Sequence, residues 1–539
     1  MAENSCVVDE PKKTWNLPFL VVFSGISQLF KLDDLGMEIL SIALPAAMAL
    51  AADPIASLID TAFIGHLGPV EIAAVGVAIS ILNQANKVTI FPLVNITTSF
   101  VAEEESVRRM TESTVKEKEL TKEKPKDCEL EKMETGLATS NGTKISTHQD
   151  GTKTKNVCTT PSTENNASNK KVKREKRHIP SASTALVMGI ILGLLQTGML
   201  ILPAKQLLGL MGVKPESPMF APAQKYMFLR ALGAPAVLLS LAMQGIFRGL
   251  KDTKTPLYAT AIGDLANIML DPIFIFACHW GVSGAAIAHV ISQYLLCTIL
   301  FCKLVGEIEL IPPSFKALQL SRFLKNGLWL LARVIAVTFC VTVGASLAAR
   351  KGTTTMAAFQ VCLQVWMTSS LLADGLAVAG QAILASAFAE KDYSKAKAAA
   401  ARVVQMGFVM GHALALVVGL GLYFGSGVFS KDKNVIRLIT IAVPFVAGTQ
   451  PLNSVAFVLD GVNFGASDFL YSAYSMVLVA ALTISSEFLL SKSNGYIGIW
   501  ISLSIFMVLR TIAGLWRMVT GVGPWSFLRT KTVKLQSST

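Results

Sequence analysis

Two groups of acidic and amide side chains lie inside stretches of sequence that are otherwise apolar. Asp53 and Asp60 are seven residues apart in one stretch, and Asp264, Asn267 and Asp271 follow i, i+3, i+7 spacing in another. If these stretches are helical, each group shares one helical face. Desolvation disfavours a charged carboxylate, so such side chains can take up a proton on one side of a barrier and release it on the other. The spacing therefore predicts a cation or proton relay. The alternative is structural, since Asp60 precedes a tight connection and Asp271 precedes a proline.

Basic side chains also occur within apolar stretches, at Lys87, Arg230, Arg333 and Arg510. A guanidinium binds a carboxylate with two parallel hydrogen bonds, and an ammonium group adds a point charge. Such a set suits an organic acid that carries several negative charges. The alternatives are ion pairs inside the protein or, for Arg230 and Arg510, extension of the side chain to an interface.

Further polar side chains could line the same cavity. Gln364 and Asp374 share a face of one apolar stretch, and Asn453 follows Gln450 on another. They either line a polar cavity or tie helices together by hydrogen bonds. The predicted substrate-binding residues are therefore Arg333, Lys87, Arg510, Arg230, Asn453, Gln364 and Asp374.

The composition predicts a membrane protein. Of 539 residues 52% are hydrophobic and only 16% are charged, whereas soluble domains carry roughly 25% charged residues. The net charge of +12 has no aromatic-interleaved basic patch that would indicate nucleic acid, and basic residues beside membrane spans set topology. We therefore expect a lipid bilayer and no nucleic acid as partners.

The chain shows no enzyme or metal motif. Its six histidines have no HExxH spacing, its eight cysteines form no CxxC pair, and there is neither a G-x-S-x-G element nor a P-loop. We expect no enzyme activity, no metal and no cofactor, with an ion gradient as the energy source: protons, or Na⁺ as the alternative.

Twelve apolar stretches are long enough to cross the roughly 30 Å of bilayer hydrocarbon. They lie near 39–64, 71–101, 182–211, 222–247, 256–278, 284–305, 322–349, 355–388, 399–425, 435–459, 466–488 and 496–518. An offset of 284 residues aligns Gly68 with Gly352, and an offset of 214 aligns Gly281 with Gly495, each within a matching segment. The chain is thus predicted to be an all-α polytopic membrane protein, with about 12 transmembrane helices in two pseudo-symmetric six-helix lobes related as parallel repeats.

The expected organisation follows from these stretches. It comprises a cytoplasmic segment (1–38), a first lobe (39–305) that contains a disordered cytoplasmic loop (102–180), a linker (306–321), a second lobe (322–519) and a cytoplasmic tail (520–539). The loop holds 31 of the 84 formal charges, and a highly charged segment without apolar periodicity cannot bury a core. Basic residues gather on one side, which predicts that both termini are cytoplasmic. The sequons at Asn141 and Asn166 should then stay unmodified.

Several segments resemble the multidrug and toxic compound extrusion (MATE) transporter family. They are SLIDTAFIGHLGPVEIAAVG (57–76), NIMLDPIFIF (267–276) and GVSGAAIAHV (281–290), and the resemblance covers nearly the whole chain. Stretches such as TIFPLVNITTSFVAEEES and FVLDGVNFGASDF resemble, more narrowly, the plant citrate-efflux branch of that family. That branch also has a long cytoplasmic loop after its second span.

The resemblance implies roles for particular residues. The family's cation site has an Asp on the first span and an Asn and an Asp on the fifth, which match Asp60, Asn267 and Asp271 here. Drug-exporting plant relatives have a Glu and an Asp where this chain has Arg333 and Asn453, and this change disfavours cationic drugs and favours a carboxylate.

The resemblance implies a proton-coupled exporter of citrate, or of a related organic acid, across the plant plasma membrane. We expect it to work as a monomer by alternating access. A cation or drug antiporter, an anion channel and a lipid flippase of related architecture are the alternatives.

Overall fold

The computed structural model describes residues 33–122, 177–211, 213–310, 319–429 and 432–529. The described residues up to Arg108 and from Arg177 onward form one compact unit, which contains all the described helices apart from the end of α3. Asn141, Asn166 and most of the predicted 102–180 loop lie outside the described residues.

The structure is helical, as predicted. The first half contains α2 (Asp34–Gly65), α3 (Pro69–Lys122), α4 (Pro180–Ile201), α5 (Ala204–Leu210), α6 (Phe220–Ala231), α7 (Ala234–Gly249), α8 (Lys254–Pro272), η2 (Ile273–Ala277) and α9 (Val282–Glu307). The second half contains α10 (Leu320–Arg350), α11 (Thr353–Ala389), α12 (Tyr393–Phe429), α13 (Lys433–Gly448), α14 (Gln450–Gly465), α15 (Phe469–Thr520) and η3 (Gly523–Trp525). Two short strands, β1 (Arg177–His178) and β2 (Ile308–Glu309), pair in parallel.

Twelve membrane crossings are confirmed. Within the described residues nine helices are long and apolar enough to span a bilayer, and the bent pairs α6/α7 and α13/α14 raise the number to eleven. Helix α15 joins two helices across a break at Gly495, which makes the twelfth. Large apolar side chains such as Leu194, Leu482 and Leu489 are exposed along these helices, as expected for surfaces that face lipid.

The two halves repeat each other in backbone conformation. Gly281 has φ 54° and ψ −132°, and Gly495 has φ 64° and ψ −130°. Gly68 and Gly352 also share positive φ, at 147° and 115°. Side chains disfavour this region of backbone space, so glycine recurs where each repeat makes the same turn. The alignment predicted from the sequence pairs these same residues, which confirms the two pseudo-symmetric lobes.

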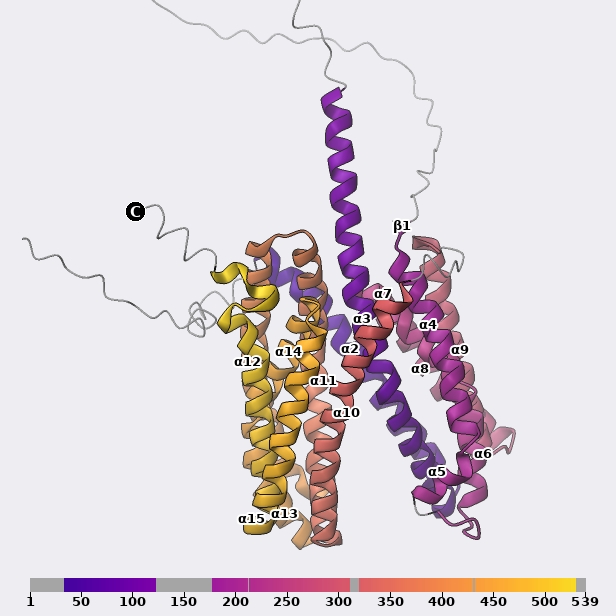
Figure 1. Cartoon of the computed structure of the whole chain (residues 1–539). Helices are drawn as coiled ribbons and strands as arrows, with labels where there is room; N and C mark the ends of the chain where they lie inside the picture. The colour runs from indigo at the N-terminus through magenta and orange to yellow at the C-terminus, as the bar shows by residue number, and fades with distance from the viewer. Residues whose placement is uncertain (1–32, 123–176, 212, 311–318, 430–431, 530–539) are drawn as a thin grey trace, which may run out of the picture. The chain divides into compact units, whose positions relative to one another are not determined.

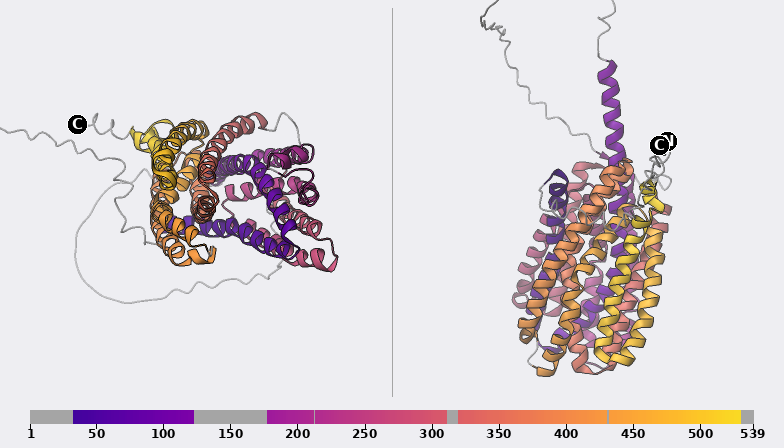
Figure 2. Two further views of the ribbon diagram at one scale, coloured as in Figure 1. Left: turned by 90° about the horizontal axis from the view of Figure 1, so that it is seen from below. Right: turned by 90° about the vertical axis from the view of Figure 1, so that its left-hand side faces the viewer.

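Each lobe packs as a bundle, but the first helix of each lobe also contacts the other lobe. Figure 1 shows α12, α13, α14 and α15 side by side, and α4, α6, α8 and α9 likewise; Figure 2 shows the same bundles from two further sides. The first half of α2 packs on α11, where Gly375 lets Ala43 and Ala47 approach closely. In the matching position the start of α10 contacts α3, where the Phe323 ring lies edge-on to that of Phe100.

The predicted loop boundary at residue 102 is wrong. Helix α3 continues without interruption to Lys122, because residues 103–122 are mostly strong helix formers and oppositely charged side chains repeat at helical spacing. Arg108, for example, donates a 2.9 Å hydrogen bond to Glu105, three residues earlier. The linker also differs slightly from expectation, since α9 extends to Glu307 and β2 follows it.

Candidate functional site

The acidic group of the first lobe is built by α2 and α8. Asn267 Nδ2 donates a 2.7 Å hydrogen bond to Asp60 Oδ1 and so joins the two helices. Asn267 is buried, and Ser292 of α9 lies 3.5 Å from its carbonyl oxygen. The predicted proximity of Asp60 and Asn267 is therefore observed.

Asp271 completes this group one helical turn further along α8. Its side chain is 1% exposed, and neither carboxylate oxygen has a hydrogen-bond donor in the described part of the chain. It lies close enough to Asp60 and Arg230 to interact with both electrostatically. An ionised carboxylate without a donor is costly in a buried site. The geometry therefore suits a carboxyl group that carries a proton or a bound cation.

The other two predicted acids lie beside this pair. Asp264 is half-buried, its Oδ2 lacks a donor among the described residues, and it interacts electrostatically with Asp53 and Asp60. Asp53 is exposed and interacts electrostatically with Arg248 from α7. The five residues predicted to form the relay thus occupy one region of the first lobe.

Two of the predicted arginines meet in the second lobe. Arg333 of α10 and Arg510 of α15 both bind Oδ2 of Asp460 from α14, the latter at 2.5 Å. Both arginines are buried, at 4% and 6% exposed. The second amino group of Arg333 donates to the carbonyl of Ser472, whereas Nε of Arg510 has no acceptor in the described structure.

Aromatic rings hold the two guanidinium groups in place. The Phe464 ring lies 5.4 Å from the Arg333 guanidinium, and the Phe457 ring lies 4.3 Å from that of Arg510. Contacts of this kind stabilise a cation that has been removed from water. Two cations that share one carboxylate leave spare N–H donors, which are the groups that bind an organic anion.

A second ion cluster lies within electrostatic range of the arginine pair. Asp374 of α11 interacts with Arg510 and Asp460, and also with Arg248 from the first lobe. Arg248 is 8% exposed and interacts with Asp53 as well. Charged side chains of both lobes therefore lie within electrostatic range of one another here.

The remaining predicted substrate residues lie elsewhere. Lys87 and Gln364 are exposed, and neither makes a hydrogen bond or ion pair with the described residues. Arg230 lies over the Tyr226 ring, 5.7 Å from its centroid, and belongs with Asp271 in the first lobe. Asn453 is buried and donates to Ser370 Oγ at 2.8 Å. These four residues do not join the arginine pair.

Asp460 and Arg248 are not among the site residues predicted from the sequence. Asp460 lies in the apolar run FVLDGV, so the rule that an ionisable residue in a span is a functional candidate would have found it. Lys251 and Lys254 follow Arg248 closely, so the sequence pattern places Arg248 in a basic loop. In the structure it lies in the last turn of α7 and is buried.

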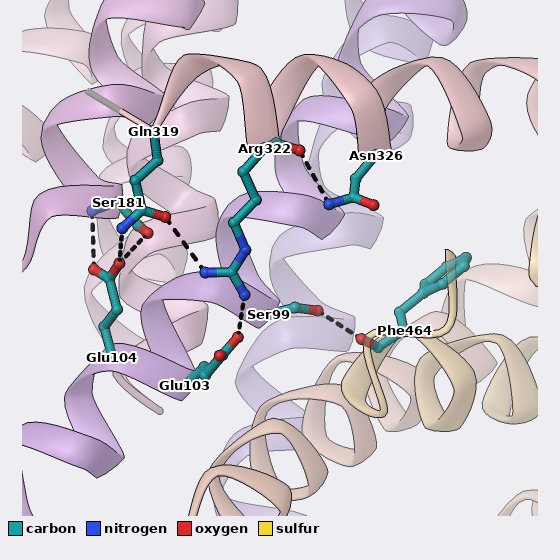
Figure 3. A network of polar contacts seen from close by, with 8 residues as sticks. All are labelled: Ser99, Glu103, Glu104, Ser181, Gln319, Arg322, Asn326 and Phe464. Atoms are coloured by element: carbon teal, nitrogen blue, oxygen red, sulfur yellow. Dashed lines mark hydrogen bonds and ion pairs between the residues drawn. The ribbon is translucent and has the colours of Figure 1, made fainter. Parts of the chain in front are cut away.

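A polar network joins the two halves at the end of the bundle where the loops rich in basic residues begin. Arg322 of α10 donates to Glu103 of α3 at 2.7 Å, and Glu104 accepts from both Ser181 and Gln319 (Figure 3). Ser99 of α3 donates to the carbonyl of Phe464 in α14, also shown in Figure 3.

The side chain of Gln381 in α11 extends this network, because it donates to Ser99 Oγ and to the Asn95 carbonyl. These bonds join the two lobes at one end of the bundle. Transporters that work by alternating access open and close contacts of this kind.

Comparisons with known proteins identify the family. Residues 171–273 and 330–489 match the MatE family model. The chain is 56% identical to "Protein DETOXIFICATION 42" of Arabidopsis thaliana, covering 98% of this chain and 100% of that protein. It is 61% identical to "Protein DETOXIFICATION 43", over 95% and 96% of the two chains, and 40% identical to "Protein DETOXIFICATION 44, chloroplastic", over 92% and 84%, both from the same plant.

Solved structures show the same fold. A MOP superfamily transporter from Pyrococcus furiosus superposes with a TM-score of 0.71 at 18% identity, over 92% of this chain and 98% of that one. An outward-facing multidrug resistance MATE transporter gives a TM-score of 0.69 at 18% identity, over 93% and 99%. Together with the relatives of high identity, these findings show that the chain belongs to the MatE family of ion-coupled membrane transporters and is not an enzyme.

Proposed function

We propose that this transporter exports citrate, or a closely related organic acid, across the plasma membrane in exchange for protons. The arginine pair on Asp460 is the observation that carries the proposal. Two buried guanidinium groups share a single carboxylate oxygen, so a carboxylate of the substrate can take up the unused donors of the pair. An organic cation would meet repulsion at the same place.

Separation of the two sites supports coupling by alternating access. The carboxylates that can carry protons lie on α2 and α8, whereas the arginine pair lies on α10, α14 and α15. Arg248 interacts electrostatically with Asp53 of the first lobe and with Asp374 of the second, and Asp374 interacts with Arg510. A change of protonation in one lobe can thus alter the field at the other without direct contact with the substrate. We propose protons as the coupling ion, with both termini cytoplasmic and the chain acting as a monomer.

A cation or drug antiporter is the second candidate, because relatives at 21–23% identity carry the names "Multidrug export protein MepA" and "Probable multidrug resistance protein NorM". The buried arginines argue against a cationic substrate for this chain. An anion channel would need the arginines but not the carboxylates of α2 and α8.

Proteoliposomes containing the purified chain separate these candidates. Liposomes loaded with labelled citrate should lose it in a protein-dependent manner, faster when the outside is acidic. A labelled organic cation in the same liposomes should stay inside. Cation efflux without citrate efflux would overturn the proposal, and citrate efflux that is indifferent to the pH difference would favour the channel.

A further inference from the structure

A buried carboxylate in the second lobe, Glu487 of α15, belongs neither to the arginine pair nor to the acidic group of the first lobe. Its side chain is 0% exposed, and neither oxygen has a hydrogen-bond donor among the described residues. The structure describes no ion pair for it within that part of the chain. Such a carboxylate is costly to ionise in a membrane protein, which makes it a candidate functional residue.

The internal repeat places Glu487 at the position of Asp271. Lys251 and Ser467, which precede α8 and α15, both have positive φ, at 63° and 55°, and they are 216 residues apart. The same offset aligns Asp271 with Glu487 in the helices that follow, and the offset becomes 214 at Gly281 and Gly495, beyond the π-helix η2. The residues are 1% and 0% exposed, so the two lobes bury a carboxylic acid at the same place.

The neighbours of the two acids correspond as well. The offset of 284 residues that pairs Gly68 with Gly352 also pairs Asp60 with Gly344. A β-carbon at Gly344 would lie 3.3 Å from Glu487 Oε1, just as Asp60 lies against Asp271. The second lobe therefore keeps the acid of α8 but has glycine in place of the acid of α2.

The surroundings of Glu487 favour a proton over a metal cation. On α10 its titratable neighbour is Cys340, whose thiol lies 3.8 Å from the Ala480 carbonyl. On the second part of α15, Tyr496 interacts with Cys362 of α11. The Lys351 ammonium group donates a 3.0 Å hydrogen bond to the Ser491 carbonyl, one turn beyond Glu487. No second carboxylate is supplied by the described residues, and Na⁺ or Ca²⁺ would require several oxygen ligands.

We propose that Glu487 is a second proton-binding site, located in the lobe that holds the arginine pair and equivalent by the internal repeat to Asp271. In the present conformation it is a neutral acid sealed from water. Rearrangement of the second lobe would expose it, so that it releases its proton and takes up another within each cycle. This inference rests on ion-coupled transport but not on the identity of the substrate.

Infrared spectroscopy of the purified full-length chain tests the proposal without any substrate. At neutral pH the wild-type protein should show carboxylic acid C=O absorption from Glu487, and Glu487→Gln should remove it, a loss of about one protonated carboxyl per chain. The matched control is Glu216→Gln, because Glu216 is exposed, and it should leave the band unchanged. Asp271→Asn should remove a separate component.

One further variant and one further condition keep the result decisive. Glu487→Asp retains the acid, so its band should shift in frequency and persist even if the Gln variant is unstable. An unchanged spectrum in Glu487→Gln, or the absence of an acid band in both variants and wild type, would overturn the proposal. Replacement of the band by carboxylate absorption when NaCl replaces choline chloride would also overturn it and would identify a sodium site.

Because none of these readouts involves citrate, failure of the citrate assignment would leave this result standing. Failure of the Glu487 assignment would likewise leave the citrate experiment intact.

Discussion

Arg333 and Arg510 approach the same oxygen atom, Oδ2 of Asp460, from two different helices. Because the two guanidinium groups share one acceptor, some of their N–H donors are not used by Asp460, whereas a one-to-one bidentate pair would leave fewer donors free. This relationship is the physical basis for proposing an anionic substrate. It can be tested by changing an arginine or by changing the shared carboxylate.

Reversal of one charge tests the arginine side. Arg333→Glu should lower the rate of citrate efflux by more than about tenfold, equivalent to about 1.4 kcal/mol, because it replaces attraction by repulsion. Arg333→Lys should retain part of the activity, since it keeps the charge but loses the planar fork. Efflux from proteoliposomes, normalised to reconstituted protein, measures both. Undiminished efflux in Arg333→Glu would remove this residue from the substrate site.

Removal of the shared carboxylate tests the other side. Asp460→Asn leaves two buried guanidinium groups without their common partner, and breaking a buried pair typically costs about 3–5 kcal/mol. The melting temperature in detergent should fall, and citrate should raise it more in the variant than in wild type, because the substrate carboxylate replaces the lost one. A fall that citrate does not reverse would indicate a purely structural triad.

The ion pair between the lobes should matter more for cycling than for stability. Arg322 and Glu103 are 40% and 36% exposed, and pairs of this kind contribute about 0–1 kcal/mol. Arg322→Glu brings like charges together and should slow efflux while changing the melting temperature little. The double variant Glu103→Arg/Arg322→Glu restores the pair and should recover the rate. Equal rates for the single and double variants would contradict a gating role.

Close packing between α14 and α11 makes a glycine indispensable. A β-carbon at Gly461 would overlap the carbonyl of Ala377, whereas one at Gly76 would have no atom within 4 Å. Gly461→Ala should therefore destabilise the protein by about 1–3 kcal/mol, seen as a lower melting temperature. Gly76→Ala is the control and should show no such loss. Similar melting temperatures for the two would argue against this packing.

Local patterns in the sequence predicted much of the fold and of the first-lobe site. Helical spacing by itself places Asp264, Asn267 and Asp271 on one face, and the contact between Asp60 and Asn267 follows once α2 and α8 pack together. The ion pair between Arg333 and Asp460 could not be predicted in this way. It depends on how α10 and α14 approach each other, and periodicity within one helix does not encode that approach.

The boundary of the long loop could not be predicted for a different reason. The segment after residue 102 combines many charges with few apolar residues, which is the composition of a disordered segment. The same charges stabilise a helix when opposite signs are three or four residues apart, as in the pair of Glu105 and Arg108. Composition alone does not distinguish the two outcomes.

Proton-driven citrate export can be measured as citrate efflux under an imposed pH difference. Proteoliposomes loaded with labelled citrate are compared with and without an acidic exterior for wild type, Asp60→Asn and Asp271→Asn. Both substitutions keep the side-chain size and remove the titratable group. Wild type should export citrate faster when the exterior is acidic than when no pH difference is imposed. Both variants should lose that acceleration while retaining citrate binding. Variants that respond to the pH difference as wild type does would show that Asp60 and Asp271 do not couple proton movement to citrate export.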